Sequence, residues 1–352
     1  MKLFTVGPVE MYPYTLETRK NQIPYFRTDE FSSIMSKNEK LLKELVGTSQ
    51  KSYCAFLTGS GTAAMEAVIS NCFNNQDKVL IINGGTFGER FIQLCQMYKI
   101  PYDEIYVEYG ETFIKEMLIP YQTVDYSAML VNIHETSTGQ LYDINILKDF
   151  CQKKHMRLVV DAISSFLSDP YQMDKYNIDC TIISSQKALA LAPGLSMVVM
   201  NSSFYDENIE RGDSPQYYLD LKNYVLNIKR GQTPFTPAVG ICYELYERLN
   251  MIKKINLENE LKIVQQRAEY FRIKALEIGL KIPDYPLSNT LTPIIFEKGN
   301  ADNIYHFLKE NYDIVVTPNG GKLKDTILRV GHIGNLSLTD YDFLISKIKE
   351  IL

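Results

Sequence analysis

The chain has 352 residues, of which 45% are hydrophobic and 22% are charged, so its composition is that of a globular protein with room for one large domain and a smaller companion. Its 37 basic and 42 acidic residues give a formal net charge of -5. No block rich in Lys and Arg stands out, which argues against nucleic acid or an anionic membrane as the main partner. Small molecules are the expected ligands.

The six cysteines and four histidines are scattered along the chain without metal-ligand or CxxC spacing, so we expect neither a metal site nor a disulfide framework. The first residues, "MKLFTVGPVEMYPY", are interrupted by Pro8 and Glu10 too early for the apolar core of a signal peptide. The most apolar interior run, residues 188–200, contains Pro193 and Gly194 and is too short to span a bilayer. We therefore expect a soluble protein of the reducing cytoplasm.

From about residue 53 to residue 200, short apolar runs alternate with longer segments of helical character. Unbroken apolar runs are typical of strands in a mainly parallel sheet that is covered by helices on both faces. The predicted strands are residues 53–57, 79–83, 127–133, 157–160, 180–184 and 197–200. In such α/β sheets, ligands bind at the carboxyl ends of the strands.

The pattern changes in the last third of the chain. A long amphipathic helix is predicted over residues 256–280, and shorter strands and helices follow it. This change predicts a second, smaller α+β domain at the C-terminus. We predict an N-terminal arm over residues 1–15, a large ligand-binding domain over residues 16–255 and a small domain over residues 256–352.

The stretch "FLTGSGTAAMEAVIS" leads from a predicted strand into a helix through a glycine-rich turn. Free backbone N–H groups at Ser60, Gly61 and Thr62, together with the helix dipole, would bind a phosphate. An ordinary turn with Ser or Thr capping is the equally simple alternative. The turn also fits a dinucleotide fingerprint, but the next strand ends in "NGG" instead of the acid that would bind a ribose, which weakens a nicotinamide-dependent function.

Two charged residues follow the next buried strands. Asp161 ends "RLVVD", where it would either cap a turn or pair with a cationic nitrogen. Lys187 follows "TIISSQ" in apolar sequence, where it would either reach solvent along its stem or stay buried as a neutral amine that reacts with aldehydes. With the turn before them, these residues match the phosphate, the pyridinium nitrogen and the aldehyde of pyridoxal phosphate (PLP).

A series of motifs then occurs in the order known from one enzyme family: "VGPVEMYP", "GSGTAAMEA", "NGGTFGER", "HETSTG", "VDAISS", "SSQKAL" and "LRVGHIG". Over nearly its whole length the sequence resembles the class V, fold type I PLP-dependent aminotransferases, in the branch of the alanine-glyoxylate, serine-pyruvate and 2-aminoethylphosphonate-pyruvate enzymes. The resemblance implies amino transfer by a ping-pong mechanism. The donor would be of the alanine, serine or 2-aminoethylphosphonate type, and the acceptor a small 2-oxo acid such as pyruvate or glyoxylate.

The resemblance also implies roles for single residues. Lys187 would bind PLP covalently and then move the proton of the substrate's α-carbon, Asp161 would form a salt bridge with the pyridinium nitrogen, and Arg329 would bind the substrate carboxylate. The alternative for Arg329 is a structural ion pair. The other implied cofactor contacts are phosphate binding by Ser60, Gly61 and Thr62 with Gln186, ring stacking by Phe87 with Ile163 on the opposite face, and Thr136 near the phenolic oxygen.

The segment "QTPFTPAVG" resembles the family segment that reaches into the neighbouring subunit. Thr236 would therefore complete the partner's phosphate site, which implies an obligate homodimer with active sites at the subunit interface. The segment around Arg27 resembles the family's entrance region only loosely. Arg27 is therefore a weak candidate for the substrate site, and a surface ion pair is the use that we expect for it.

Two other functions remain open on this fold. A class V lyase such as a cysteine desulfurase would stack a histidine on the cofactor and attack with a mobile-loop cysteine, whereas this chain has Phe87 and, after Lys187, only Cys242 inside a predicted helix. A non-catalytic binding protein would be expected to have lost Lys187 or Asp161, and both are present. Since the sequence places no second basic residue in the substrate pocket, it does not distinguish between the donors.

Overall fold

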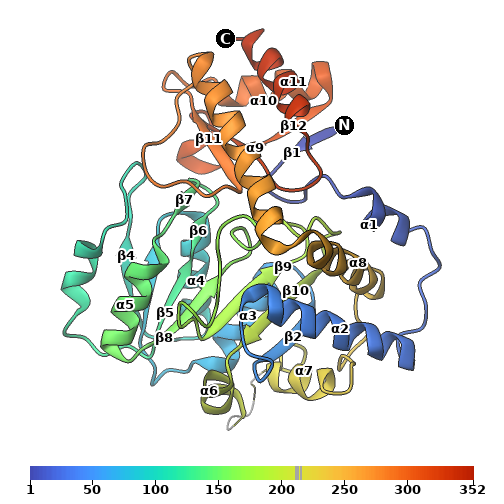
Figure 1. Cartoon of the computed structure of the whole chain (residues 1–352). Coiled ribbons are helices and arrows are strands. Elements are labelled where there is room, and N and C mark those ends of the chain that lie inside the picture. Colours follow the sequence, from blue (N-terminus) through green and yellow to red (C-terminus); the bar gives the residue numbers. More distant parts are fainter. Residues whose placement is uncertain (211–213, 215) are drawn as a thin grey trace.

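A computed structural model describes residues 1–210, 214 and 216–352, and its main feature is a large sheet below a smaller one (Figure 1). The large sheet has seven strands in the order β2-β10-β9-β8-β5-β3-β4. The strands are Tyr53–Thr58 (β2), Val79–Asn83 (β3), Tyr102–Tyr106 (β4), Ala128–Asn132 (β5), Arg157–Asp161 (β8), Cys180–Ser184 (β9) and Leu195–Met200 (β10).

The large sheet is mainly parallel, as the unbroken apolar runs predict. Only β10 runs antiparallel, to both β2 and β9. The connection from β9 to β10, residues 185–194, is too short for a crossover helix, so the chain turns back on itself. The sequence pattern misses β4, because this edge strand reads "YDEIY" and buries only Ile105.

Helices cover both faces of the large sheet. Along β5, Met129 and Val131 belong to one hydrophobic core and Ala128 and Leu130 to the other, because successive side chains point to opposite faces. The first core is covered by Asp29–Val46 (α2), Ile144–Lys154 (α5) and Val239–Ile255 (α8), and the second by Gly61–Cys72 (α3), Thr86–Met97 (α4) and Leu221–Ile228 (α7). Shorter helices are Pro13–Thr18 (α1), Lys115–Tyr121 (η1), Ser202–Tyr205 (α6) and Asp206–Glu210 (η2).

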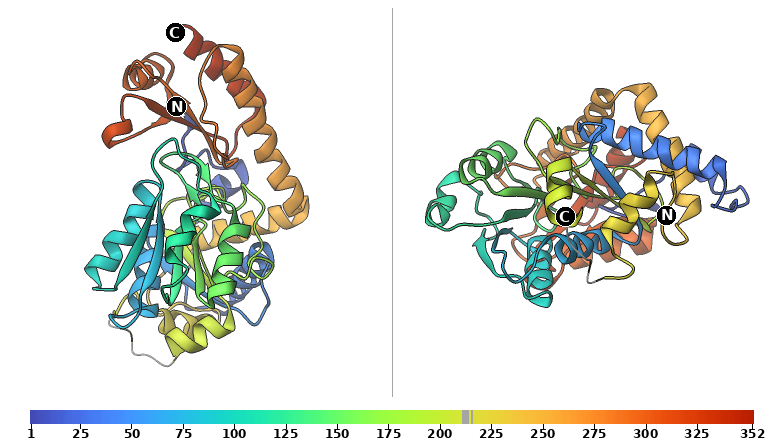
Figure 2. Two further views of the ribbon diagram at one scale, coloured as in Figure 1. Left: turned by 90° about the vertical axis from the view of Figure 1, so that its left-hand side faces the viewer. Right: turned by 90° about the horizontal axis from the view of Figure 1, so that it is seen from below.

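The second sheet has the order β1-β12-β13-β11. Its strands are Lys2–Phe4 (β1), Leu291–Ile295 (β11), Ile314–Pro318 (β12) and Ile327–Gly331 (β13), and its helices are Leu257–Glu277 (α9), Ala301–Tyr312 (α10) and Leu338–Lys349 (α11), with a short turn at Gly321–Leu323 (η3). Figure 2 shows α9, the long orange helix, along one side of the molecule, where it reaches from the part with the smaller sheet toward the part with the larger sheet. Because β1 pairs with β12, the first residues of the chain form an edge of this C-terminal sheet. The domain boundaries at residues 15 and 255 stay a prediction.

Two further observations concern the whole chain. All six cysteines are free and buried. Within residues 1–210, 214 and 216–352, no helix is long and apolar enough to cross a membrane, and no group of His, Cys, Asp and Glu side chains could hold a metal ion.

Candidate active site

The predicted site residues gather around one cavity of about 100 Å³ where the strands of the large sheet end. It is lined by Ser60, Gly61, Thr62, Phe87, Arg90, His134, Thr136, Asp161, Ile163, Ser164, Gln186 and Lys187. These include every cofactor contact predicted from the sequence except Thr236. The parallel topology produces this convergence, because it brings the carboxyl ends of β5, β8 and β9 to the same edge.

The glycine-rich turn leaves hydrogen-bond donors free at the start of α3. Ser60 is the N-cap residue, but its side chain makes no capping hydrogen bond within the described part of the chain. The N–H of Thr62, the second helical residue, thus lacks the acceptor that an ordinary Ser cap would provide, and no described group accepts from the N–H of Gly61. Gly61 lies close to Ile163: a Cβ atom there would lie 2.3 Å from Cδ1 of Ile163, so a larger residue would require the Ile163 side chain to move. This geometry fits a phosphate bound at the helix N-terminus.

Lys187 is buried in the wall of the same cavity, and Gly7 of the opening motif "VGPVEMYP" packs against its side chain. A Cβ atom on Gly7, whose φ is +139°, would lie 2.7 Å from Cδ of Lys187. Burial, assisted by the charge of Arg329, lowers the pKa of Lys187 to about 8, although Asp161 opposes this shift. No described residue forms an ion pair with its amine. With this pKa, about a tenth of the amine is neutral at pH 7, far more than for an ordinary lysine, and the neutral form is the nucleophile.

Asp161 is buried at the end of β8 with one oxygen free. Its Oδ1 accepts a hydrogen bond from the N–H of Ile163 at 2.8 Å, and no described residue donates to Oδ2. Burial raises the pKa of Asp161 to about 6, while the Ile163 N–H and the positive charge of Lys187 lower it. A cationic ring nitrogen at Oδ2 would compensate for the buried carboxylate.

Three other predicted residues are held in place by neighbouring polar groups. Gln186 accepts a hydrogen bond from the Ser184 hydroxyl through Oε1, which leaves its amide N–H groups available. Thr136 donates from Oγ1 to Oγ of Ser164 at 2.8 Å. The N–H of Phe87 donates to the buried carboxylate of Glu135 at 3.4 Å.

Glu135 was not predicted as a site residue, but it fixes the start of α4. Its carboxylate accepts hydrogen bonds from the N–H groups of Phe87 and Gly88 and from Nδ2 of Asn132. A carboxylate at a helix N-terminus is stabilised by the helix dipole. Glu135 therefore holds the backbone from which the Phe87 ring projects into the cavity.

Arg329 reaches the site from β13 of the second sheet. Its Nη1 donates to the carbonyl oxygen of Thr136 at 3.0 Å and its Nη2 to that of Pro318 at 2.7 Å. Its Nε is buried without a partner, and burial lowers the pKa of the guanidinium to about 10. Within the described ranges, no carboxylate forms the structural ion pair considered as the alternative for Arg329. A carboxylate bound through Nε–H and one remaining Nη–H would satisfy the side chain.

Two polar residues of the cavity were missed by sequence reasoning. His134 is buried, and neither ring nitrogen has a hydrogen-bond partner. Burial, with the charges of Lys187 and Arg329, lowers its pKa to about 3, so the imidazole is neutral. Arg90 projects from α4 one turn after Phe87. Helical spacing after Phe87 was a signal for a residue near Arg90, although it does not give the direction of that side chain, and the two-residue strand that contains His134 gave no such signal.

Thr236 and Arg27 lie away from this cavity. Thr236 is exposed and lines a separate hollow of about 740 Å³. Arg27 donates to Oε1 of Gln232 at 3.0 Å and to the carbonyl oxygens of Thr233 and Pro234. The surface ion pair expected for Arg27 is therefore wrong for the described part of the chain, because backbone carbonyls take the place of a carboxylate. Arg27 instead holds the segment that leads to Thr236.

The arrangement fits PLP on three counts. The unsatisfied N–H groups at α3 suit a phosphate, the free oxygen of Asp161 suits a pyridinium nitrogen, and the buried amine of Lys187 suits an aldehyde. The half-buried ring of Phe87 and the side chain of Ile163 supply apolar surface in the same cavity.

Known proteins share both this sequence pattern and this fold. The family model for class-V aminotransferases matches residues 18–329. An uncharacterized aminotransferase of Methanocaldococcus jannaschii is 32% identical over 340 residues, which cover 94% of this chain and 87% of the relative. The L-aspartate--glyoxylate aminotransferase of Paracoccus denitrificans is 27% identical over 307 residues, 84% of this chain and 77% of the relative. The crystal structure of alanine--glyoxylate aminotransferase from Nostoc sp. matches with a TM-score of 0.93 at 26% identity, covering 99% of this chain and 94% of that one.

Proposed function

Since this chain belongs to the class-V aminotransferase family and is a PLP-dependent transaminase, we propose that it transfers an amino group between a small amino donor and a small 2-oxo acid by a ping-pong mechanism. One observation carries the proposal: the phosphate-binding turn, Asp161 and Lys187 line a single cavity. The names of the Paracoccus and Nostoc relatives share glyoxylate, which supports an acceptor of the glyoxylate or pyruvate type. The donor would be of the alanine, serine or 2-aminoethylphosphonate type.

Lys187 and Asp161 would have different roles in amino transfer. When bound, PLP supplies an electron sink for the electron pair released at the substrate's α-carbon. Nζ of Lys187 would bind the cofactor covalently and, once the substrate amine has replaced it, would take the proton from the substrate's α-carbon and deliver it to C4′ of the cofactor. The carboxylate of Asp161 would keep the ring nitrogen protonated.

Substrate orientation would come from the second sheet. Arg329 donates from Nη1 to the carbonyl oxygen of the cavity residue Thr136 and has an unpaired Nε–H, so the substrate carboxylate would lie between the two sheets. The neutral imidazole of His134 lies among the same charged groups, since Lys187 and Arg329 are the main charges that act on it. A bound oxygen atom would give this buried ring the partner that it lacks.

We also propose a cytoplasmic homodimer in which Thr236 completes the partner's phosphate site. Support comes from the exposed position of Thr236, away from its own chain's cavity. Ile23 and Tyr25 expose 59% and 68% of their surface close in sequence to this hollow, and a second copy would cover such apolar area. The six free cysteines suit a reducing compartment. Light scattering of the purified protein measures the assembly, and a monomer with full activity would contradict this proposal.

The rival lyase function has less support. A desulfurase needs a reactive cysteine, but Cys242 is fully buried within α8 and burial raises its pKa to about 12. A thiol of this kind is neither accessible nor ionised at neutral pH. Phe87, and not a histidine, occupies the position predicted to stack on the cofactor ring.

A donor screen tests the proposed function directly. The protein loaded with PLP should show the visible absorbance of cofactor bound to lysine. Alanine, serine, aspartate, glutamate and 2-aminoethylphosphonate are then added singly without acceptor, and we expect one of the small donors to bleach the band and glyoxylate or pyruvate to restore it. Sulfide release from cysteine without any amino transfer would contradict the proposal in favour of the lyase.

A further inference from the structure

Arg90 is the charged residue of the cavity to which no role has been assigned so far. It lies on α4 and lines the cavity together with the glycine-rich turn. Its Nη1 donates to Oγ1 of Thr62 at 3.1 Å. Its Cζ lies 4.8 Å from the centre of the Phe87 ring, so the guanidinium contacts both the turn and the stacking side chain.

The guanidinium of Arg90 has spare hydrogen-bonding capacity. A guanidinium carries five N–H donors, and the structure shows one hydrogen bond from Arg90, to Thr62. Among residues 1–210, 214 and 216–352, no carboxylate forms an ion pair with it. The side chain is half-buried and lies next to the uncapped start of α3, and a guanidinium is a cation at every pH at which proteins fold.

A charge count shows why a cation is needed at this point. A phosphate monoester carries a charge of about -1.5 to -2 at neutral pH. The N-terminus of α3 contributes roughly half a positive charge, and Ser60, Thr62 and Gln186 are neutral. Lys187 cannot supply the missing charge if its amine is used for covalent binding.

We propose that Arg90 binds the phosphate of the cofactor, donating from its free N–H groups while Nη1 holds the Thr62 hydroxyl toward the same phosphate. Because the guanidinium also lies against Phe87, the residue couples the phosphate site to the ring-stacking site. This inference rests on the proposed use of PLP, but not on the identity of the amino donor.

Two ligands that differ only by the phosphate separate this role from a structural one. Apoprotein is titrated with PLP and, separately, with pyridoxal, and the dissociation constants are read from absorbance. For Arg90→Gln we expect PLP binding to weaken by at least about tenfold, the loss of a charged hydrogen bond, while pyridoxal binding changes less than about threefold. Arg90→Lys should recover part of the PLP affinity, since lysine keeps the charge but not the forked donor geometry.

A matched control removes a positive charge elsewhere. Lys153 is exposed on α5, so Lys153→Gln should leave both dissociation constants unchanged. The melting temperature of the Arg90→Gln apoprotein should stay close to that of the wild type, because no buried partner loses its ion pair.

Other outcomes overturn the proposal. Equal weakening of PLP and pyridoxal would mean that Arg90 acts only through Phe87, and unchanged PLP binding would mean that it does not contact the phosphate. If the wild-type protein itself does not bind PLP, the proposed function fails together with this inference. If it binds PLP and the variant responds in one of these two ways, only the role of Arg90 is wrong.

Discussion

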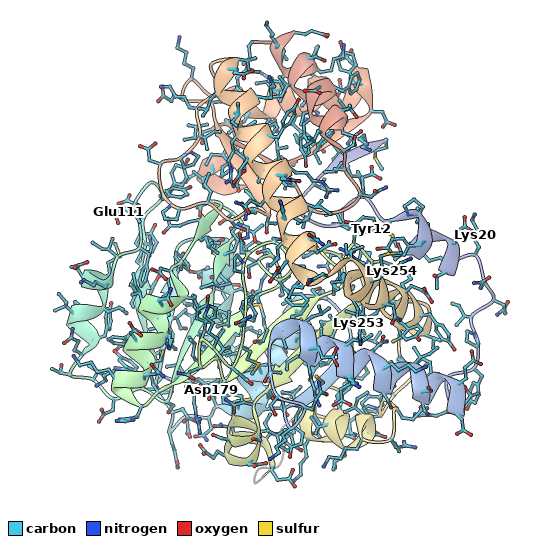
Figure 3. The ribbon with its side chains drawn as sticks, in the orientation of Figure 1. Tyr12, Lys20, Glu111, Asp179, Lys253 and Lys254 are labelled. Carbon is cyan, nitrogen blue, oxygen red and sulfur yellow. The ribbon has the colours of Figure 1, made fainter. Side chains whose placement is uncertain are left out.

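The two ends of the large sheet differ in how completely their polar groups are paired. At the amino ends, Asp179 precedes β9 (Figure 3) and accepts hydrogen bonds from Nη1 of Arg157 at 3.0 Å, Nδ2 of Asn201 at 2.9 Å and the N–H of Leu158 at 2.8 Å. At the carboxyl ends, the amine of Lys187 has no partner among the described residues, and both ring nitrogens of His134 are likewise unpaired.

Size alone would select the wrong end. The hollow beside Asp179 and Arg157 measures about 880 Å³, whereas the cavity beside Lys187 measures about 100 Å³. Burying a polar group without a partner costs free energy, so unpaired buried groups persist where a ligand supplies the partner. The comparison teaches that unsatisfied hydrogen-bonding capacity locates this site better than volume does.

The largest expected effect is at Lys187. Replacing it by Met, which is similar in length but cannot bind an aldehyde, should lower transamination by at least about 1000-fold. Folding should not suffer, because a buried amine without a partner is removed. Turnover is measured with the donor found in the screen, and thermal unfolding is measured on the apoprotein. Full turnover in Lys187→Met would show that this residue neither binds the cofactor nor transfers the proton. The unpaired groups at the carboxyl ends of the sheet would then not mark the active site.

Asp161→Asn should lower turnover by about 100-fold, because a neutral amide does not keep the ring nitrogen protonated. In contrast to turnover, the stability of the folded apoprotein should not fall on this substitution. Burial raises the pKa of Asp161 from 3.8 to about 6, so the wild-type apoprotein loses stability as the pH rises between these values, and above about pH 6 the cost is fully present. Urea unfolding at pH 8 should therefore show the Asn apoprotein to be at least as stable as the wild type. Lower stability with unchanged turnover would assign Asp161 a structural role only.

The rate at which PLP binds covalently to the apoprotein should rise with pH. Burial lowers the pKa of Lys187 from 10.5 to about 8, and only the neutral amine reacts, so the rate should rise about tenfold per pH unit well below pH 8 and level off above it. Stopped-flow absorbance between pH 6 and pH 10 measures this dependence. A rate that still rises steeply at pH 10 would show that the amine is solvated like an ordinary surface lysine.

The smallest effect on catalysis is expected at the opposite end of the sheet. Asp179→Ala removes three hydrogen bonds and leaves Arg157 without this acceptor, which should cost about 2 kcal/mol of unfolding free energy. Turnover of the folded protein should stay within about twofold of the wild type. Urea denaturation and steady-state rates under the same conditions test both statements. If Asp179→Ala lost turnover without losing stability, the amino ends of the strands would belong to the functional site.

Much of this site could be predicted before the fold was known. Gly61, Asp161 and Lys187 each follow a short apolar run, and a parallel sheet brings such positions to one edge. Arg90 and His134 could not be assigned to the site in the same way. They lie in a helix and in a two-residue strand, and the direction of their side chains is known only once these elements are packed against the sheet. The pattern also missed strand β4. This strand lies at the edge of the large sheet, where most side chains are only partly buried, so it does not need an unbroken apolar run.

The sequence by itself determined the alternation of buried strands with helices, the class of the sheet and the chemistry available at the strand ends, since these depend on local apolar patterning and on residue type. The tertiary structure decided which of those groups remain unpaired. It placed Gly7 against Lys187, turned Arg27 toward backbone carbonyls, carried Arg329 in from a second sheet and set Arg90 beside Thr62. These contacts join residues far apart in the chain, and the free energy of burying each group depends on neighbours that only the folded structure supplies.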